Sequence, residues 1–218
     1  DLDIQRRVKA VVLDNGEIIE CDNCVFSAHP RFLPTMLPEG TLRPAFRGRI
    51  ESLNDTMSAI VLFCTSEKTA QASDFTNIIL TQRHFPDIFG ARVGASMPPL
   101  FISRSVSKEH ASGISVICPW DHNELLSWET SVCGKRDAVY YEWKKNIAEM
   151  IITEIRTCMK ECLCDLECID IATPLTFRDY MNAPNGCLYG VKHGIDDMPF
   201  LPQTKIQGLF LSGQMLLS

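Results

Sequence analysis

The spacing of hydrophobic residues along the chain predicts more strands than helices. Short apolar runs, rich in β-branched and aromatic residues, alternate with turn-forming residues and have the length of strands. Asn15 and Gly16 separate the first two runs and give a strong hairpin signal, so residues 8–28 are expected to form a small antiparallel meander. The predicted strands span residues 8–13, 18–21, 24–28, 57–64, 77–80, 99–103, 114–118, 169–172 and 209–211.

One long segment has the period of an amphipathic helix. From residue 137 to 159, apolar side chains recur on one stripe and charged side chains lie off it. A shorter helix is expected over 44–54, where Pro44 suits a first helical turn. Residues 82–98 are expected to form a short helix and a loop. The predicted core-facing stripe consists of Tyr140, Trp143, Ile147, Met150, Ile151, Ile155 and Met159.

These elements together predict an α+β fold. The strands between residues 57 and 118 are expected to form a mixed, mostly antiparallel sheet, with helices packed on one face. Between the runs at 169–172 and 209–211 we expect a long ordered loop. This segment carries too many large apolar side chains for a disordered linker.

Composition narrows the class of protein. The chain has 218 residues and a formal net charge of −6, which argues against a nucleic-acid partner because phosphate binding needs a basic face. It contains neither an apolar run of about eighteen residues nor a signal-peptide core at its start. A cytoplasmic location is expected, with membrane association left open. Since the sequence starts without Met and inside an apparent element, we expect an excised piece of a longer protein.

The chain contains ten cysteines, and their spacing favours free thiols over metal ligands. A disulfide scaffold is expected in short secreted chains, and this sequence has no secretion signal. Cys158, Cys162, Cys164 and Cys168 match neither paired zinc knuckles nor a ferredoxin run. We therefore expect buried free cysteines in a reducing compartment and no metal site.

No catalytic residue can be assigned from the sequence. The five histidines are scattered without metal-site spacing, and no G-x-S-x-G nucleophile motif occurs. Neither G-x-G-x-x-G nor a Walker loop is present, so the sequence contains no recognisable phosphate-binding turn.

Three motifs in the last fifty residues occur in a specific order. They are Thr-Pro-Leu-Thr-Phe at 173–177, a Gly…Tyr-Gly element at 186–190, and T-K-I-Q-G-L-F-L-S-G-Q at 204–214. In this order they resemble the C-terminal part of the phytoene desaturase and carotenoid isomerase family of flavoproteins, which includes retinol saturase. Residues 8–30 also resemble the end of the flavin-binding half of such enzymes, and the resemblance is weak over 31–136.

The resemblance implies a fragment of an FAD-dependent oxidoreductase that acts on a long apolar polyene, as in carotenoid biosynthesis or retinoid metabolism. It implies the substrate domain of a flavin amine oxidase-like fold over 31–172, with pieces of the flavin-binding domain at 1–30 and 173–218. FAD is expected in the full-length parent and not on this chain alone. The expected flavin-proximal residues are Thr173, Pro174, Gly186, Tyr189, Gly190 and Gly213.

The substrate implied is an apolar small molecule held in an apolar channel. The strands at 57–64, 99–103 and 114–118 suit one wall of that channel. Two alternatives stay open: a related flavoenzyme acting on an amine, and an apolar-ligand or partner-binding module without catalysis. The chain alone is expected to be inactive, and both peripheral membrane contact and a homodimer remain open.

Overall fold

The computed structural model describes residues 6–66, 76–81, 97–105, 112–194, 200–213 and 216. The chain forms two compact units. The first unit consists of Asp1–Thr56 together with Tyr189–Ser218, and the second unit is Met57–Leu188. The assignment of 1–30 and 173–218 to a flavin-binding domain stays a prediction.

The first unit contains two small pairs of strands. β1 (Ala10–Val12) and β2 (Ile18–Glu20) form the predicted antiparallel hairpin. β3 (Cys24–Phe26) instead pairs in parallel with β9 (Leu209–Leu211). The meander predicted over 8–28 is therefore wrong for its third strand, because the partner of β3 comes from the far end of the sequence.

Short helices complete the first unit. η1 (Pro30–Phe32) leads into α1 (Leu33–Met36), and α2 (Pro44–Glu51) confirms the short helix that begins at a proline. Their apolar residues pack with β9 and the segment before it. The buried members of this core are Val8, Leu33, Ile50, Phe200, Ile206, Leu209 and Leu211.

The second unit is built on a five-stranded sheet in the order β5-β6-β7-β4-β8, and all neighbouring strands are antiparallel. This confirms the α+β class and the mostly antiparallel sheet. The helix and loop predicted over 82–98 lie almost entirely outside the described residues. The strands are β4 (Ser58–Ser66), β5 (Asn77–Leu80), β6 (Leu100–Ser105), β7 (Ser112–Trp120) and β8 (Glu167–Ala172).

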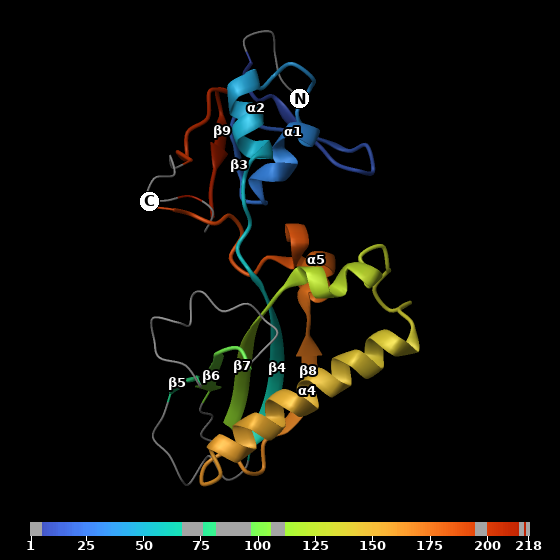
Figure 1. The fold of residues 1–218 in the computed structure, drawn as a ribbon. Coiled ribbons are helices and arrows are strands. Elements are labelled where there is room, and N and C mark those ends of the chain that lie inside the picture. The colour runs from blue at the N-terminus through green and yellow to red at the C-terminus, as the bar shows by residue number, and fades with distance from the viewer. Residues whose placement is uncertain are drawn as a thin grey trace. The chain divides into compact units, whose positions relative to one another are not determined.

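The long helix α4 (Ala138–Cys158) lies across one face of this sheet (Figure 1). The carboxylate of Asp137 caps it by accepting a hydrogen bond from the Tyr140 amide at 2.9 Å. Most of the predicted stripe faces the sheet, but Met150 is 43% exposed and Ile152 is buried in its place. The register of the buried stripe therefore differs slightly from the predicted one.

The segment after β8 is helical where a long irregular loop was predicted. α5 spans Pro174–Met181 and ends at Asn182 in the left-handed conformation. Thr173 and Thr176 form a capping box in which the Thr176 hydroxyl accepts a hydrogen bond from the Thr173 amide at 3.0 Å. The loop prediction is wrong because this cap and the proline at the first turn start a helix. Two 3₁₀ segments complete the unit, η3 (His122–Trp128) and η4 (Pro184–Gly186).

The ten cysteines all lie among the described residues, and none of them forms a disulfide bond. Only Cys64, Cys118 and Cys187 are buried, so the expected burial of the thiols is correct for these three alone. None of the helices in the described part of the chain has the length and apolar character needed to cross a bilayer.

Candidate functional site

The candidate site lies on the sheet face opposite α4, which we call the open face. Side chains alternate between the two faces of a strand. In β4, Leu62 and Cys64 belong to the core beneath α4, whereas Ala59, Val61 and Phe63 belong to the open face. Both faces of β4 are therefore apolar, which is why its sequence shows a continuous hydrophobic run and no alternation.

An unbroken row of apolar residues crosses the open face. Ile79 pairs with Phe101, Phe101 with Ile117, Ile117 with Val61, and Val61 with Ala172. We call these five residues the apolar row. Since adjacent strands lie about 4.8 Å apart, the row spans about 19 Å. It is most accessible at one end, where Ile79 is 55% exposed and Phe101 is 38% exposed.

The neighbouring positions on the open face are small or aromatic. Ser103 pairs with Ser115, and Ser115 pairs with Phe63, which is 45% exposed. These small side chains lie beside Phe101 and Ile117, in the part of the row that is exposed or half-buried. The open face can therefore cover an extended apolar molecule by hydrophobic contact, while serine hydroxyls line one side.

Residues around α5 close the other end of the row. Phe177 and Leu188 pack on Ala59, Val61 and Ala172. The expectation that helices pack on one face only is therefore incomplete, because α5 also reaches the open face.

The structure brings three of the six predicted flavin-proximal residues together at this end. Thr173 is fully buried as the cap of α5, and Pro174 follows as its first residue. Gly186 has φ +60°, and a Cβ at this position would lie 2.2 Å from the Pro174 carbonyl oxygen. The Ser58 hydroxyl donates a hydrogen bond to the Gly186 carbonyl, which ties this corner to β4.

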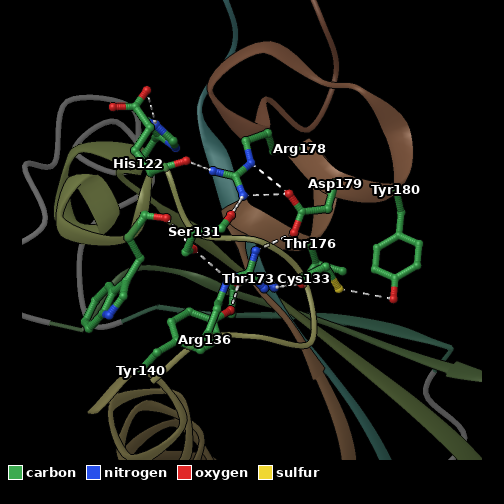
Figure 2. Close-up of polar contacts among 12 residues, drawn as sticks. His122, Ser131, Cys133, Arg136, Tyr140, Thr173, Thr176, Arg178, Asp179 and Tyr180 are labelled. Atoms are coloured by element: carbon green, nitrogen blue, oxygen red, sulfur yellow. Dashed lines mark hydrogen bonds and ion pairs between the residues drawn. The ribbon is translucent and has the colours of Figure 1, made fainter. Parts of the chain in front are cut away.

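A network of two arginines and one aspartate holds α5 against the segment before α4 (Figure 2). Arg178 Nε donates to Asp179 Oδ1 at 2.8 Å, and Arg136 pairs with the second carboxylate oxygen. Arg136 Nε also donates to the Ser131 hydroxyl at 3.0 Å, and Arg178 Nη2 donates to the Ser131 carbonyl at 2.8 Å. We call Arg136, Arg178 and Asp179 the arginine–aspartate network.

A second contact links α4 directly to the cap of α5 (Figure 2). The Tyr140 and Thr173 hydroxyls lie 2.8 Å apart in a buried hydrogen bond. Burial raises the pKa of Tyr140, so its hydroxyl remains protonated at neutral pH. The guanidinium of Arg136 lies over the same ring, 4.9 Å from its centre. Thr173 is therefore positioned from two sides, by its own helix and by α4.

The other three predicted residues lie in the first unit. The Tyr189 amide donates to the Thr56 hydroxyl at 3.0 Å, and the Thr56 amide donates to the Gly190 carbonyl at 2.8 Å. The Tyr189 side chain is 60% exposed, so it does not belong to the core of the unit. Gly213 follows β9 with φ +111°. The proximity of all six residues to a flavin stays a prediction.

The residues of this chain do not fit the whole of FAD. The pyrophosphate of a dinucleotide usually rests on a glycine-rich turn between a strand and a helix. β3 leads to η1 through Ser27, Ala28 and His29, and no glycine occurs there. No step of chemistry can therefore be assigned through FAD from these residues.

Sequence reasoning did not find the polar contacts around α5. Arg136 lies 43 residues from Asp179, and Tyr140 lies 33 residues from Thr173. The only local signal was the Thr-Pro-x-Thr pattern, which is a helix start as well as a family motif.

The amino-acid sequence is similar to those of retinol reductases. No protein-family model matches the chain. The all-trans-retinol 13,14-reductase of Homo sapiens is 21% identical over 222 aligned residues, which cover 94% of this chain and 36% of that protein. The enzymes of the same name from Danio rerio and Macaca fascicularis are 26% and 24% identical over 49% and 54% of this chain.

These similarities are weak and cover only part of each relative. The chain spans 18% of the zebrafish protein and 22% of the macaque protein. They nevertheless agree with the retinol saturase branch of the resemblance found in the sequence motifs. They give no separate support to its carotenoid branch.

Proposed function

We propose that this chain contributes the substrate-binding sheet of an FAD-dependent oxidoreductase that acts on a long apolar polyene of the retinoid type. The apolar row on the open face is the observation that supports the proposal most directly. The similarity to the human all-trans-retinol 13,14-reductase, which covers 94% of this chain, supports the choice of a retinoid.

The physical basis of the proposal is that a conjugated hydrocarbon offers no polar group along its length. Binding energy must then come from apolar area removed from water, at roughly 25 cal/mol per Å². The accessible part of the row, formed by Ile79, Phe101 and Ile117 on three neighbouring strands, provides that area for a stiff, extended molecule. The charged group of an amine substrate would gain nothing from the row, since none of its five side chains is polar.

In the whole enzyme the flavin would supply the hydride chemistry, and this chain would supply position and a dry surface. Within this proposal, the flavin-proximal residues of the second unit are Thr173, Pro174 and Gly186, and those of the first unit are Tyr189, Gly190 and Gly213. Residues 1–30 and 173–218 belong to the flavin-binding domain. Peripheral membrane contact would follow from the insolubility of the substrate.

The proposal is tested by titrating the 218-residue chain with all-trans-retinol and following energy transfer from tryptophan. Replacing Ile117, at the centre of the row, by Thr should weaken binding about tenfold, because a hydroxyl replaces buried apolar area. The matched control is Val139→Thr on α4, where Val139 is 63% exposed and lies off the open face. Equal retinol affinity for wild type and Ile117→Thr would contradict the proposal.

A binding module without catalysis is the second candidate, and the missing phosphate-binding glycines favour it. The two candidates differ in flavin content. The natural polypeptide that contains this chain, purified without added flavin, should show a bound-flavin absorbance spectrum if the enzyme proposal is right. A folded, colourless polypeptide that still binds retinol would favour the binding module.

A further inference from the structure

A pocket in the first unit has features that the polyene proposal does not use. It lies between α2 and the segment from Phe200 to Ile206, and its volume is about 420 Å³. Pockets for small ligands commonly enclose about 300–1,000 Å³. Phe46 and Phe200 meet edge to face in its wall, with ring centres 5.9 Å apart. Leu42 adds to this apolar surface.

Four cations surround the apolar wall: Arg6, Arg43, Arg49 and Lys205. None of the described lining residues is acidic, although the whole chain carries a net charge of −6. Arg49 lies over the Phe200 ring, with its guanidinium carbon 4.1 Å from the ring centre. Within the described part of the chain, no ion pair involves the other three cations.

The start of α2 adds a further attraction for an anion. Arg43 occupies the cap position, and no side chain caps the helix. The first turn of a helix carries the positive end of the helix dipole. Pro44 has no amide hydrogen, and the Phe46 and Arg47 amides donate to the Arg43 carbonyl, so the Ala45 amide is the donor that this turn can offer to an anion. Arg43 and Ala45 place this uncapped end in the pocket wall. Anionic and apolar surfaces of a ligand would therefore be recognised side by side.

We propose that this pocket binds an anionic amphiphile with a single long alkyl chain, of the fatty-acid type. The carboxylate contacts Arg43, Lys205 and the start of α2, and the alkyl chain packs on Phe46 and Phe200. This inference is independent of the polyene site, because all of its residues belong to the first unit. It gives the chain a second ligand, which differs from a neutral polyene in carrying a negative charge.

The first test is a competition assay on the 218-residue chain with the fluorescent fatty acid cis-parinaric acid as the probe. Palmitate should displace the probe, and hexadecanol and inorganic phosphate should each compete at least tenfold more weakly. Salt should weaken palmitate binding, because the contact is partly electrostatic. Equal competition by palmitate and hexadecanol would overturn the proposal, since the cations would then contribute nothing.

Variants locate the site. The double substitution Arg43→Glu and Lys205→Glu should weaken palmitate binding at least tenfold. Arg47→Glu, on the same helix but outside the pocket lining, is the matched control and should change it less than twofold. Ala45→Trp fills the pocket from an exposed helix position and should abolish binding while the far-ultraviolet circular dichroism is retained. Equal losses for Arg47→Glu and the double variant would count against this pocket.

Two further arms separate this site from other sources of binding. Ile117→Thr on the open face should leave palmitate affinity unchanged, so failure of the polyene site and failure of this pocket are distinguishable. Sedimentation with phosphatidylglycerol vesicles tests a lipid headgroup as the source. If the chain binds these vesicles through Arg43 and Lys205 but does not bind monomeric palmitate, the fatty-acid pocket is refuted in favour of a membrane surface.

Discussion

Gly186 controls the corner where the open face meets α5. Its φ of +60° lies in the left-handed region, and any Cβ would lie 2.2 Å from the Pro174 carbonyl oxygen. The clash is with backbone, so no side-chain rotation can relieve it. Gly186→Ala should therefore lower the free energy of unfolding by about 3 kcal/mol, as measured by urea denaturation.

Gly134 provides the matched control for this substitution. Its φ of +75° is similar, but nothing lies within 4 Å of a Cβ built there. Gly134→Ala should therefore lower the free energy of unfolding by about 1 kcal/mol, which is the cost of placing a non-glycine residue in the left-handed conformation. If both variants lower the free energy of unfolding by the same amount, the close approach between Gly186 and Pro174 does not contribute to the cost of the Gly186→Ala substitution.

Two buried thiols should resist alkylation. Burial raises the pKa of Cys64 to about 12, with a contribution from neighbouring Cys168, and burial alone raises that of Cys118 to about 12. Iodoacetamide at pH 8 should modify exposed Cys133 and spare both buried thiols in the folded chain, as read by mass spectrometry. Rapid modification of Cys118 without unfolding would contradict its burial.

The same shifts predict a loss of stability in alkaline solution. A thiol ionises near pH 9 when unfolded and near pH 12 in the folded chain, so its protonated form is favoured by folding. The contribution of each buried thiol to the free energy of unfolding is complete below about pH 8. It is lost as the pH rises from about 9, the pKa in the unfolded chain, to about 12, the pKa in the folded chain. At pH 10 the loss should be roughly 1 kcal/mol for each thiol. Cys118→Val should reduce the pH dependence of the urea midpoint.

At the scale of elements, α5 depends on the arginine–aspartate network. The Arg136 side chain is 5% exposed and Asp179 is 14% exposed, so neither charge is well solvated when its partner is lost. Asp179→Asn keeps the shape but removes the charge shared by Arg136 and Arg178. We expect a loss of about 3 kcal/mol in the free energy of unfolding.

The control for this change is Glu149→Gln. Glu149 pairs with Lys145 on the exposed side of α4, where both side chains are more than 60% exposed. Exposed pairs contribute little, so a change below about 0.5 kcal/mol is expected. Both variants are compared with the wild type by thermal unfolding. If Asp179→Asn and Glu149→Gln lower the stability by similar amounts, the arginine–aspartate network does not anchor α5.

The sequence predicts helices and strands correctly where a clear apolar run or amphipathic period specifies them. It does not predict those whose pairing or position depends on contacts with distant parts of the chain. The strands of the large sheet and the helix α4 follow from apolar runs and amphipathic spacing. The pairing of β3 with β9 joins residues almost two hundred positions apart, and no local signal specifies it. α5 lies in the segment predicted as a long loop, because the Thr-Pro-x-Thr pattern, recognised only as a family motif, also caps a helix.

The candidate site was predictable only in part. Thr173, Pro174 and Gly186 were identified from motif order, and the structure gathers them at one corner. The sequence predicted that the strands at 57–64, 99–103 and 114–118 would form one wall of an apolar channel, but it did not identify the residues of the apolar row. Its residues follow from the register between strands, which hydrophobicity alone cannot supply when both faces of a strand are apolar.

At the scale of the whole molecule, the chain combines two units with different binding surfaces. The second unit offers a neutral, extended apolar face. The first unit offers a pocket with cations around an apolar wall. The proposed retinoid-binding role would use the first surface, and the proposed fatty-acid site would use the second.

The central claim is that the open face holds a retinoid. Isoleucine methyl groups report on it directly, because Ile79 and Ile117 lie on the open face while Ile114 and Ile151 lie in the core beneath α4. We would record methyl NMR spectra of the 218-residue chain during titration with all-trans-retinol. The account predicts saturable shifts of the Ile79 and Ile117 methyl signals and unchanged Ile114 and Ile151 signals. Unmoved open-face signals at saturating retinol would contradict it.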